Sequence, residues 1–141
     1  MSNMPKDLWI NLPVKDIRKS KAFFTEIGFP LNPNCPNNDE VVSLLIGEQN
    51  VAVMLFPEAT LRSFAGSDLT DTSKSMEVLL SIGANSKDEV DELVKKVMQA
   101  GGTIYSDPKE DGWMYGAGFA DVDGHRWNVL YMDPAKMPLK D

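Results

Sequence analysis

The sequence predicts an α+β chain made of two similar modules, each with one strand, one helix and two or three further strands. Three observations favour this class. Short apolar segments of strand length alternate with two amphipathic segments of helical period. The order of segments repeats: the first strands align at a constant offset of 68 residues, and the two helices then fall in register. The length of 141 residues is enough for a single domain with its own core.

The first module begins with an apolar strand and continues into a helix with one apolar face. Asp16 can cap this helix, and Gly28 is suited to end it. A loop with three prolines and four asparagines follows, and then two apolar strands joined by a short turn. The expected elements are a strand at residues 8–14, a helix at 17–27 and strands at 41–46 and 51–56.

The second module repeats this order. Its first strand carries one charged residue, Glu77. A Ser-Lys-Asp-Glu sequence at residues 86–89 has the spacing of a capping box, and the following apolar residues recur at helical spacing up to the Gly-Gly pair at 101–102. The expected strands lie at residues 76–82, 103–105, 113–119 and 126–132, with turns at 107–108 and 123–124.

Residues 58–75 break the pattern and read as a linker, or as a lid that closes over a ligand. We therefore expect one domain over residues 1–141. Module one spans about residues 7–57, module two about 76–133, and a C-terminal tail covers 134–141.

Composition limits the function. The formal charge of −7 argues against nucleic acid or an anionic membrane as the main partner, because both bind clustered Lys and Arg. Cys35 and His125 are the sole residues of their kinds, which excludes an intrachain disulfide, a cysteine-based zinc site and a two-histidine metal motif. No apolar run is long enough to span a bilayer. We expect a soluble protein of the reducing cytoplasm.

Two groups of short motifs lie near the two ends of the chain. The first group comprises Asn-Leu-Pro-Val-Lys-Asp at residues 11–16, Ser20 with Ala-Phe-Phe at 22–24, and Ile-Gly-Phe at 27–29. The second comprises Phe-Ala-Asp-Val-Asp-Gly-His at 119–125 and Trp-Asn-Val-Leu at 127–130.

In their order and separation, these motifs resemble the vicinal oxygen chelate superfamily, which includes glyoxalase I, bleomycin-resistance proteins and extradiol dioxygenases. The resemblance covers about residues 7–133. It implies two βαβββ modules whose curved mixed sheets enclose one cleft, and it implies a homodimer.

The resemblance also implies four inward positions that bind a divalent ion in the metal-dependent members. Here these positions hold Trp9, Met54, Glu77 and Asn128. Glu77 is the one strong ligand and Asn128 a weak one, whereas indole cannot coordinate and a thioether suits these ions poorly. We therefore expect no cofactor and disfavour a divalent metal. His125 belongs to the turn, where we expect it to pack or hydrogen-bond locally.

The same positions suggest a cleft for a small molecule. Glu77 would be a general base if it were buried, since burial favours the protonated carboxyl near neutral pH; alternatively it faces solvent or pairs with a basic residue. Each aromatic or methionine residue of the set could instead simply fill a core. The expected lining is apolar at Trp9, Met54, Trp113 and Tyr115, and polar at Asn11, Glu77, Arg126 and Asn128.

Three hypotheses follow. The first is a metal-independent protein that binds a small apolar or aromatic molecule, as bleomycin-resistance proteins do. The second is a lyase, isomerase or dioxygenase-type enzyme that uses Glu77 as a base or residual metal ligand. The third is a dimerisation or interaction module in which no ligand matters. Fold does not decide among them.

Overall fold

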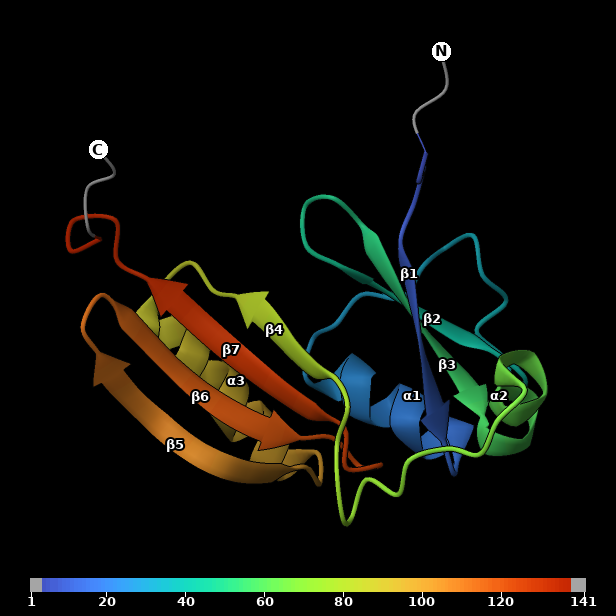
Figure 1. The fold of residues 1–141 in the computed structure, drawn as a ribbon. Coiled ribbons are helices and arrows are strands. Elements are labelled where there is room, and N and C mark those ends of the chain that lie inside the picture. Colours follow the sequence, from blue (N-terminus) through green and yellow to red (C-terminus); the bar gives the residue numbers. More distant parts are fainter. Residues whose placement is uncertain (1–3, 138–141) are drawn as a thin grey trace. The chain divides into compact units, whose positions relative to one another are not determined.

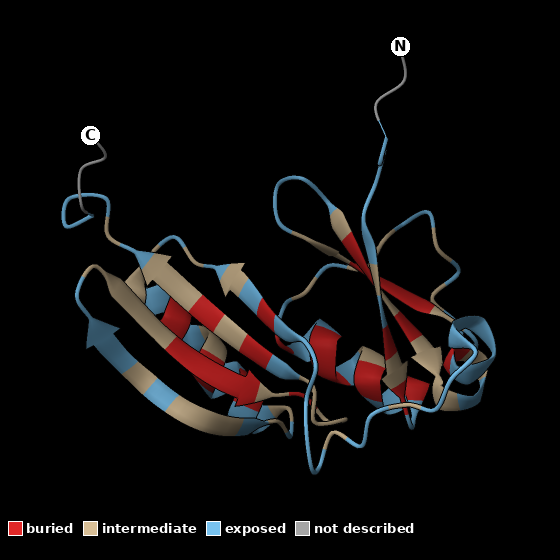
Figure 2. Cartoon of the chain, viewed as in Figure 1, coloured by how far each residue is buried: buried red, intermediate tan, exposed pale blue. Residues whose placement is uncertain are grey.

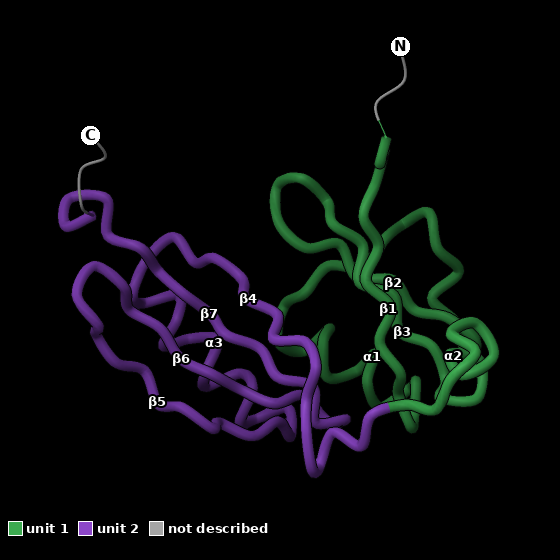
Figure 3. The backbone as a smooth tube through the Cα atoms, viewed as in Figure 1, with its two compact units in different colours: residues 1–69 green, residues 70–141 purple. Residues whose placement is uncertain are grey.

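The computed structural model describes residues 4–137, and its chain divides into two units, Met1–Leu69 and Thr70–Asp141 (Figures 1 and 3). The boundary falls inside the segment expected to be a linker. Part of the expected C-terminal tail, residues 138–141, lies outside the described residues. Within the described part, no helix is both long and apolar enough to cross a membrane.

The first unit holds a three-stranded mixed sheet of order β1-β3-β2. β1 runs parallel to β3, and β2 runs antiparallel to it. Asp16 caps α1 as expected, since its carboxylate accepts hydrogen bonds from the backbone N–H groups of Arg18 and Lys19. The elements are β1 Trp9–Val14, α1 Ile17–Glu26, β2 Val42–Ile46, β3 Val51–Pro57 and α2 Glu58–Ala65.

The core of the first unit lies between α1 and one face of this sheet (Figure 2). Leu12 pairs with Leu55 across β1 and β3, and both are buried. Phe23 and Phe24 of α1 are each 1% exposed. Burial of one such aromatic side chain contributes roughly 1.5–3 kcal/mol, so these residues hold the helix on the sheet.

Helix α2 is the main difference from the expected architecture, because it occupies the start of the segment interpreted as irregular. Leu61 is buried, the ring of Phe64 packs edge-on against Phe56 with 5.2 Å between centroids, and Gly66 ends the helix in a left-handed conformation. Over the described residues, the first module is therefore βαββ followed by a helix, with no fourth strand.

The second unit has a four-stranded mixed sheet of order β4-β7-β6-β5, in which β4 runs parallel to β7 and the other neighbours are antiparallel (Figure 1). Helix α3 covers one face of this sheet, with Val90 and Val94 packed on Ala117 and Val129. The elements are β4 Leu79–Gly83, α3 Lys87–Gln99, β5 Thr103–Asp111, β6 Met114–Ala120 and β7 Arg126–Met132. Together the two units confirm the α+β class.

Two strands of the second unit differ from their expected bounds. β4 begins at Leu79 rather than at residue 76. β5 continues through residues 107–108, which were expected to form a turn, because two register shifts against β6 absorb the proline. β7 has the expected bounds.

The N-terminus of α3 confirms the expected serine cap. The backbone N–H of Glu89 donates to Oγ of Ser86 at 3.1 Å, and the Glu89 carboxylate accepts from the backbone N–H of Asn85 at 2.8 Å. The glutamate thus reaches one residue further back than in a standard capping box.

Replacing Ser86 with alanine is expected to lower the free energy of unfolding by about 1 kcal/mol, because one N–H of the first turn loses its acceptor. Urea denaturation followed by circular dichroism measures this change. Ser75→Ala is the matched control, since Ser75 is exposed and outside any helix. Equal stability of the two variants would contradict the capping role.

A buried carboxylate organises the turn between β6 and β7. Asp121 is 5% exposed, and its Oδ1 accepts hydrogen bonds from the backbone N–H groups of Asp123 and His125, each at 3.0 Å. Its Oδ2 accepts from Nε1 of Trp127 at 3.2 Å. Burial raises the pKa of Asp121, and the nearby His125 partly offsets this rise. His125 therefore lies in the turn, as expected.

Candidate functional site

The sheet of the second unit has one face covered by α3 and one face that α3 leaves open. Alternation along β7 separates the two: Trp127 and Val129 are buried on the helix side, whereas Arg126, Asn128 and Leu130 point the other way. We call the second side the open face. This separation of the β7 residues confirms the alternation expected from the sequence.

The open face carries a hollow of about 170 Å³. An apolar cavity of roughly 150 Å³ admits one benzene molecule, so the hollow has room for a single ring. Its walls combine apolar side chains with a few polar groups, a mixture typical of small-molecule sites. The lining residues are Ser106, Lys109, Asp111, Met114, Gly116, Ala117, Asn128 and Leu130.

Two glycines of β6 form the floor of the open face. A Cβ atom at Gly118 would lie 2.4 Å from the ring of Tyr105, and one at Gly116 would lie 2.5 Å from Cδ2 of Leu130. Neither distance is possible for a real side chain. The two glycines therefore allow Tyr105 and Leu130 to lie against the sheet.

Tyr105, Asn128 and Arg126 form a polar cluster on this face. The hydroxyl of Tyr105 donates to Oδ1 of Asn128 at 2.7 Å. The Arg126 guanidinium carbon lies 4.4 Å from the centroid of the Tyr105 ring, within the range of a cation–π contact. Burial raises the pKa of Tyr105, and the charge of Arg126 partly offsets this rise, so the hydroxyl keeps its proton at neutral pH.

Sequence reasoning did not identify Tyr105. It was placed in a short strand, and nothing in its immediate neighbours marks it as functional. The usable signal lay elsewhere, in the alternating glycines Gly116 and Gly118 inside an otherwise regular strand. Such glycines mark places where another group approaches the backbone closely.

Three expected lining residues lie in the first unit, on the sheet face opposite α1. Asn11 and Met54 are direct neighbours across β1 and β3, so the structure brings these two together. Trp9 pairs with Ala52 and is 67% exposed. Trp9 and Asn11 are exposed and Met54 is half-buried, so these residues form a partly exposed apolar and amide surface on their own unit.

Trp113 and Tyr115 do not join Arg126 and Asn128 on the open face. Tyr115 lies on the helix side, where its hydroxyl donates to Oδ1 of Asp91 on α3 at 2.6 Å, and this hydrogen bond raises the pKa of Tyr115. Trp113 lies in the turn between β5 and β6, near Lys87 of α3. Tyr115 therefore lies on the side opposite to the open face, whereas it was expected to line the cleft together with Arg126 and Asn128.

Glu77 is exposed and precedes β4 by two residues, so the alternative in which it faces solvent is observed and the one in which it is buried in a strand is not. Its neighbours Met76 and Val78 are also exposed. The sheet positions of β4 on the open face are instead Leu79 and Ser81, opposite Arg126 and Asn128.

The donor set does not fit the divalent ion that the resemblance implies. Trp9 and Met54 offer no suitable donor atom, and the Asn128 carbonyl oxygen already accepts a hydrogen bond from Tyr105. Across residues 4–137 no group of three or more His, Cys, Asp and Glu side chains is placed to hold a metal ion.

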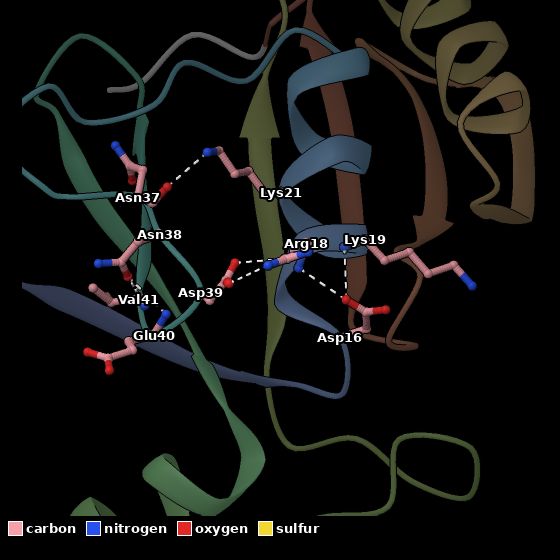
Figure 4. Close-up of polar contacts among 9 residues, drawn as sticks. All are labelled: Asp16, Arg18, Lys19, Lys21, Asn37, Asn38, Asp39, Glu40 and Val41. Carbon is pink, nitrogen blue, oxygen red and sulfur yellow. Dashed lines mark hydrogen bonds and ion pairs between the residues drawn. The ribbon is translucent and has the colours of Figure 1, made fainter.

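A larger groove of about 620 Å³ lies in the first unit, between α1 and residues 37–39 (Figure 4). Within the described part of the chain, three of its four charged side chains are already engaged, Glu26 being the exception. Arg18 forms an ion pair with Asp39 at 2.6 Å, which holds the pKa of Asp39 below its usual value, and Nζ of Lys21 donates to the backbone oxygen of Asn37 at 2.8 Å. The hollow of the second unit is therefore the stronger candidate, although it is smaller.

Both the sequence and the architecture of this chain are similar to those of known proteins. Residues 8–129 match the family model of the Glyoxalase/Bleomycin resistance protein/Dioxygenase superfamily. A hypothetical protein, SA1046 from S. aureus, is similar in structure with a TM-score of 0.80 and 36% sequence identity, covering 92% of this chain and 95% of that one. A comparison with curated proteins gives no match.

Two more distant structures share the fold. A glyoxalase-related enzyme from Fulvimarina pelagi has a TM-score of 0.75 at 20% identity, covering 91% of this chain and 88% of that one. TnmS3, an antibiotic binding protein from Streptomyces sp. CB03234, has a TM-score of 0.62 at 18% identity, covering 94% and 100%. The match over residues 8–129 confirms the resemblance found in the sequence, and this chain belongs to the Glyoxalase/Bleomycin resistance protein/Dioxygenase superfamily.

Proposed function

We propose that this protein binds a small apolar or aromatic molecule on the open face of its second sheet, without a catalytic metal ion. The hollow over Gly116 carries the proposal: it has the size of one ring, apolar walls in Met114 and Leu130, and a polar end at Asn128. The fold is shared with TnmS3, an antibiotic binding protein, so this fold is one that can serve a binding role. Such a protein would sequester or sense its ligand.

A ring-sized substitution in the hollow tests this proposal. Ser106→Phe is expected to abolish binding of benzamide, a neutral single-ring ligand, because the new side chain would fill the space. Thr103→Phe is the matched control: it adds the same ring to the same strand, opposite Ala120, outside the hollow. Isothermal titration calorimetry measures both. Retained affinity in the Ser106 variant would contradict the proposed site.

The metal content of the purified protein tests the proposal that the ligand binds without a catalytic metal ion. Protein purified without chelator is expected to contain well below one divalent ion per chain by elemental analysis, because Trp and Met occupy two of the four implied positions. Near-stoichiometric nickel, zinc, manganese or iron that is lost in a Glu77→Gln variant would overturn it.

Catalysis by Glu77 receives less support from the geometry. The hypothesis of a general base depended on burial, and Glu77 is exposed outside β4. Homodimerisation, a cytoplasmic location and the alternative of a pure interaction module stay predictions, which rest on the resemblance and on composition.

A further inference from the structure

We infer that the hollow selects a single-ring aromatic carboxylate, and that Tyr105 sets this preference by fixing the orientation of the Asn128 amide. The inference rests on the proposed function and adds the chemical class of the ligand. It depends on which end of the Asn128 amide is available, on what holds Tyr105 in place, and on the charges that surround the pair.

The Asn128 amide has an accepting end and a donating end, and the structure occupies the accepting one. The Tyr105 hydroxyl has one proton, and its distance of 2.7 Å to Oδ1 of Asn128 is shorter than its distance of 3.1 Å to the carbonyl oxygen of Trp127. The shorter contact therefore takes the proton. Nδ2 of Asn128 has no partner among residues 4–137, and Asn128 lines the hollow. A ligand there meets N–H donors.

Tyr105 cannot easily move away from this position. Its ring lies against Gly118 on one side, and the Arg126 guanidinium is stacked on the ring at 4.4 Å. The hydroxyl is directed at Asn128 by contacts on two sides. An amide held in this way is preorganised to donate, and a ligand need not pay for orienting it.

Cations outnumber carboxylates around the Tyr105–Asn128 pair, since Arg126 lies over the Tyr105 ring while Lys109 and Asp111 line the hollow. Arg126 is exposed and forms no ion pair with any carboxylate in the described part of the chain. Lys109 lines the hollow and is likewise unpaired, while Asp111 is the carboxylate among the lining residues. These cations lie on a chain whose formal charge is −7, so their local effect opposes the overall charge. A carboxylate beside Asn128 would gain charge-assisted hydrogen bonds.

Three ligands of one ring size test the inference: benzoate, benzamide and benzylamine, titrated by calorimetry at low ionic strength. Benzoate is expected to bind at least about 10-fold more tightly than benzamide, and benzylamine more weakly than both. Tyr105→Phe is expected to reduce the preference for benzoate over benzamide to less than about threefold, because the amide is then free to turn.

Variants that change the charge near the hollow provide a second test of the inference. Arg126→Gln is expected to weaken benzoate binding by about 10-fold and to weaken benzamide binding by less than about threefold. Asn128→Asp, which replaces the donor with a carboxylate, is expected to reverse the preference towards benzylamine. Lys95→Gln is the matched control, since it removes the same charge from an exposed position on α3.

The outcomes distinguish a failure of this inference from a failure of the proposed function. If benzamide binds the parent and the Ser106→Phe substitution abolishes that binding, but benzoate binds no more tightly than benzamide, the inference is overturned and the proposed function stands. Equal preference for benzoate in the parent and in the Tyr105→Phe variant would also overturn it, provided circular dichroism shows that the variant is folded. If none of the three rings binds, the proposed function fails, and the inference fails with it.

Discussion

Replacing Asp121 with alanine is expected to lower the free energy of unfolding by about 3 kcal/mol. The carboxylate satisfies two backbone N–H groups of its turn and the indole N–H of Trp127, which is 1% exposed. Truncation leaves these donors without their acceptor, and a buried unsatisfied donor costs roughly 1–3 kcal/mol. The parent chain bears the cost of burying the Asp121 charge, and its removal offsets part of the summed cost of the lost hydrogen bonds.

Urea denaturation at pH 7 measures this loss, with Asp107→Ala as the control because Asp107 is an exposed aspartate on β5. Asp121→Asn is expected to fall between the parent and Asp121→Ala. Its carbonyl oxygen can keep the two turn bonds, whereas its amide nitrogen cannot accept from Trp127. An Asp121→Ala variant within about 0.5 kcal/mol of the parent would contradict the account of the turn.

The pH dependence gives an independent check on the same carboxylate. Burial raises the pKa of Asp121 above its ordinary value, so in the window between the two values the folded chain binds more protons than the unfolded chain. Stability from this group therefore falls as pH rises through that window. Relative to Asp121→Asn, the parent should gain stability as the pH is lowered through the raised pKa.

Replacing Gly118 with alanine is expected to lower the free energy of unfolding by about 2 kcal/mol, because overpacking a close contact usually costs 1–3 kcal/mol. The added Cβ would lie 2.4 Å from the Tyr105 ring, so the ring must leave its place. The hydrogen bond to Asn128 and the stacking with Arg126 would then be lost, and with them the preference for benzoate.

A double mutant separates this mechanism from a general effect on the strand. In a Tyr105→Ala background, Gly118→Ala is expected to cost less than half of its original effect, because no ring remains to be displaced. Gly83→Ala is the control, since Gly83 lies on the same sheet and nothing is within 4 Å of its added Cβ. Additive effects of Gly118 and Tyr105 would contradict the direct contact.

Much of the fold could be predicted because local signals agreed with packing. Asp16 and Ser86 marked the two helix starts correctly, and the i, i+3, i+4 spacing marked the face of α3 that packs on the sheet. Helix α2 escaped prediction for a physical reason. It is eight residues long, has no side-chain cap and is stabilised by tertiary contacts through Leu61.

The site was harder to predict than the fold. Alternation within β7 correctly placed Arg126 and Asn128 on one face, since that needs a single strand. Tyr115 was placed wrongly because its face depends on the pairing of β6 with β7, which sets Tyr115 opposite Tyr131. A shift of one residue in the register between β6 and β7 would have placed Tyr115 on the opposite face of the sheet. Tyr105 reaches Asn128 across β6, a contact that no local pattern encodes.

The most direct test of the central claim is a titration of the isotope-labelled chain with benzamide, followed by two-dimensional NMR. We expect saturable shifts that are largest for the backbone amides of Gly116 and Gly118 and for the side-chain amide of Asn128. Saturable shifts confined to other surfaces, such as α3, would contradict the claim that the open face of the second sheet is the ligand site, as would no shifts up to the solubility limit.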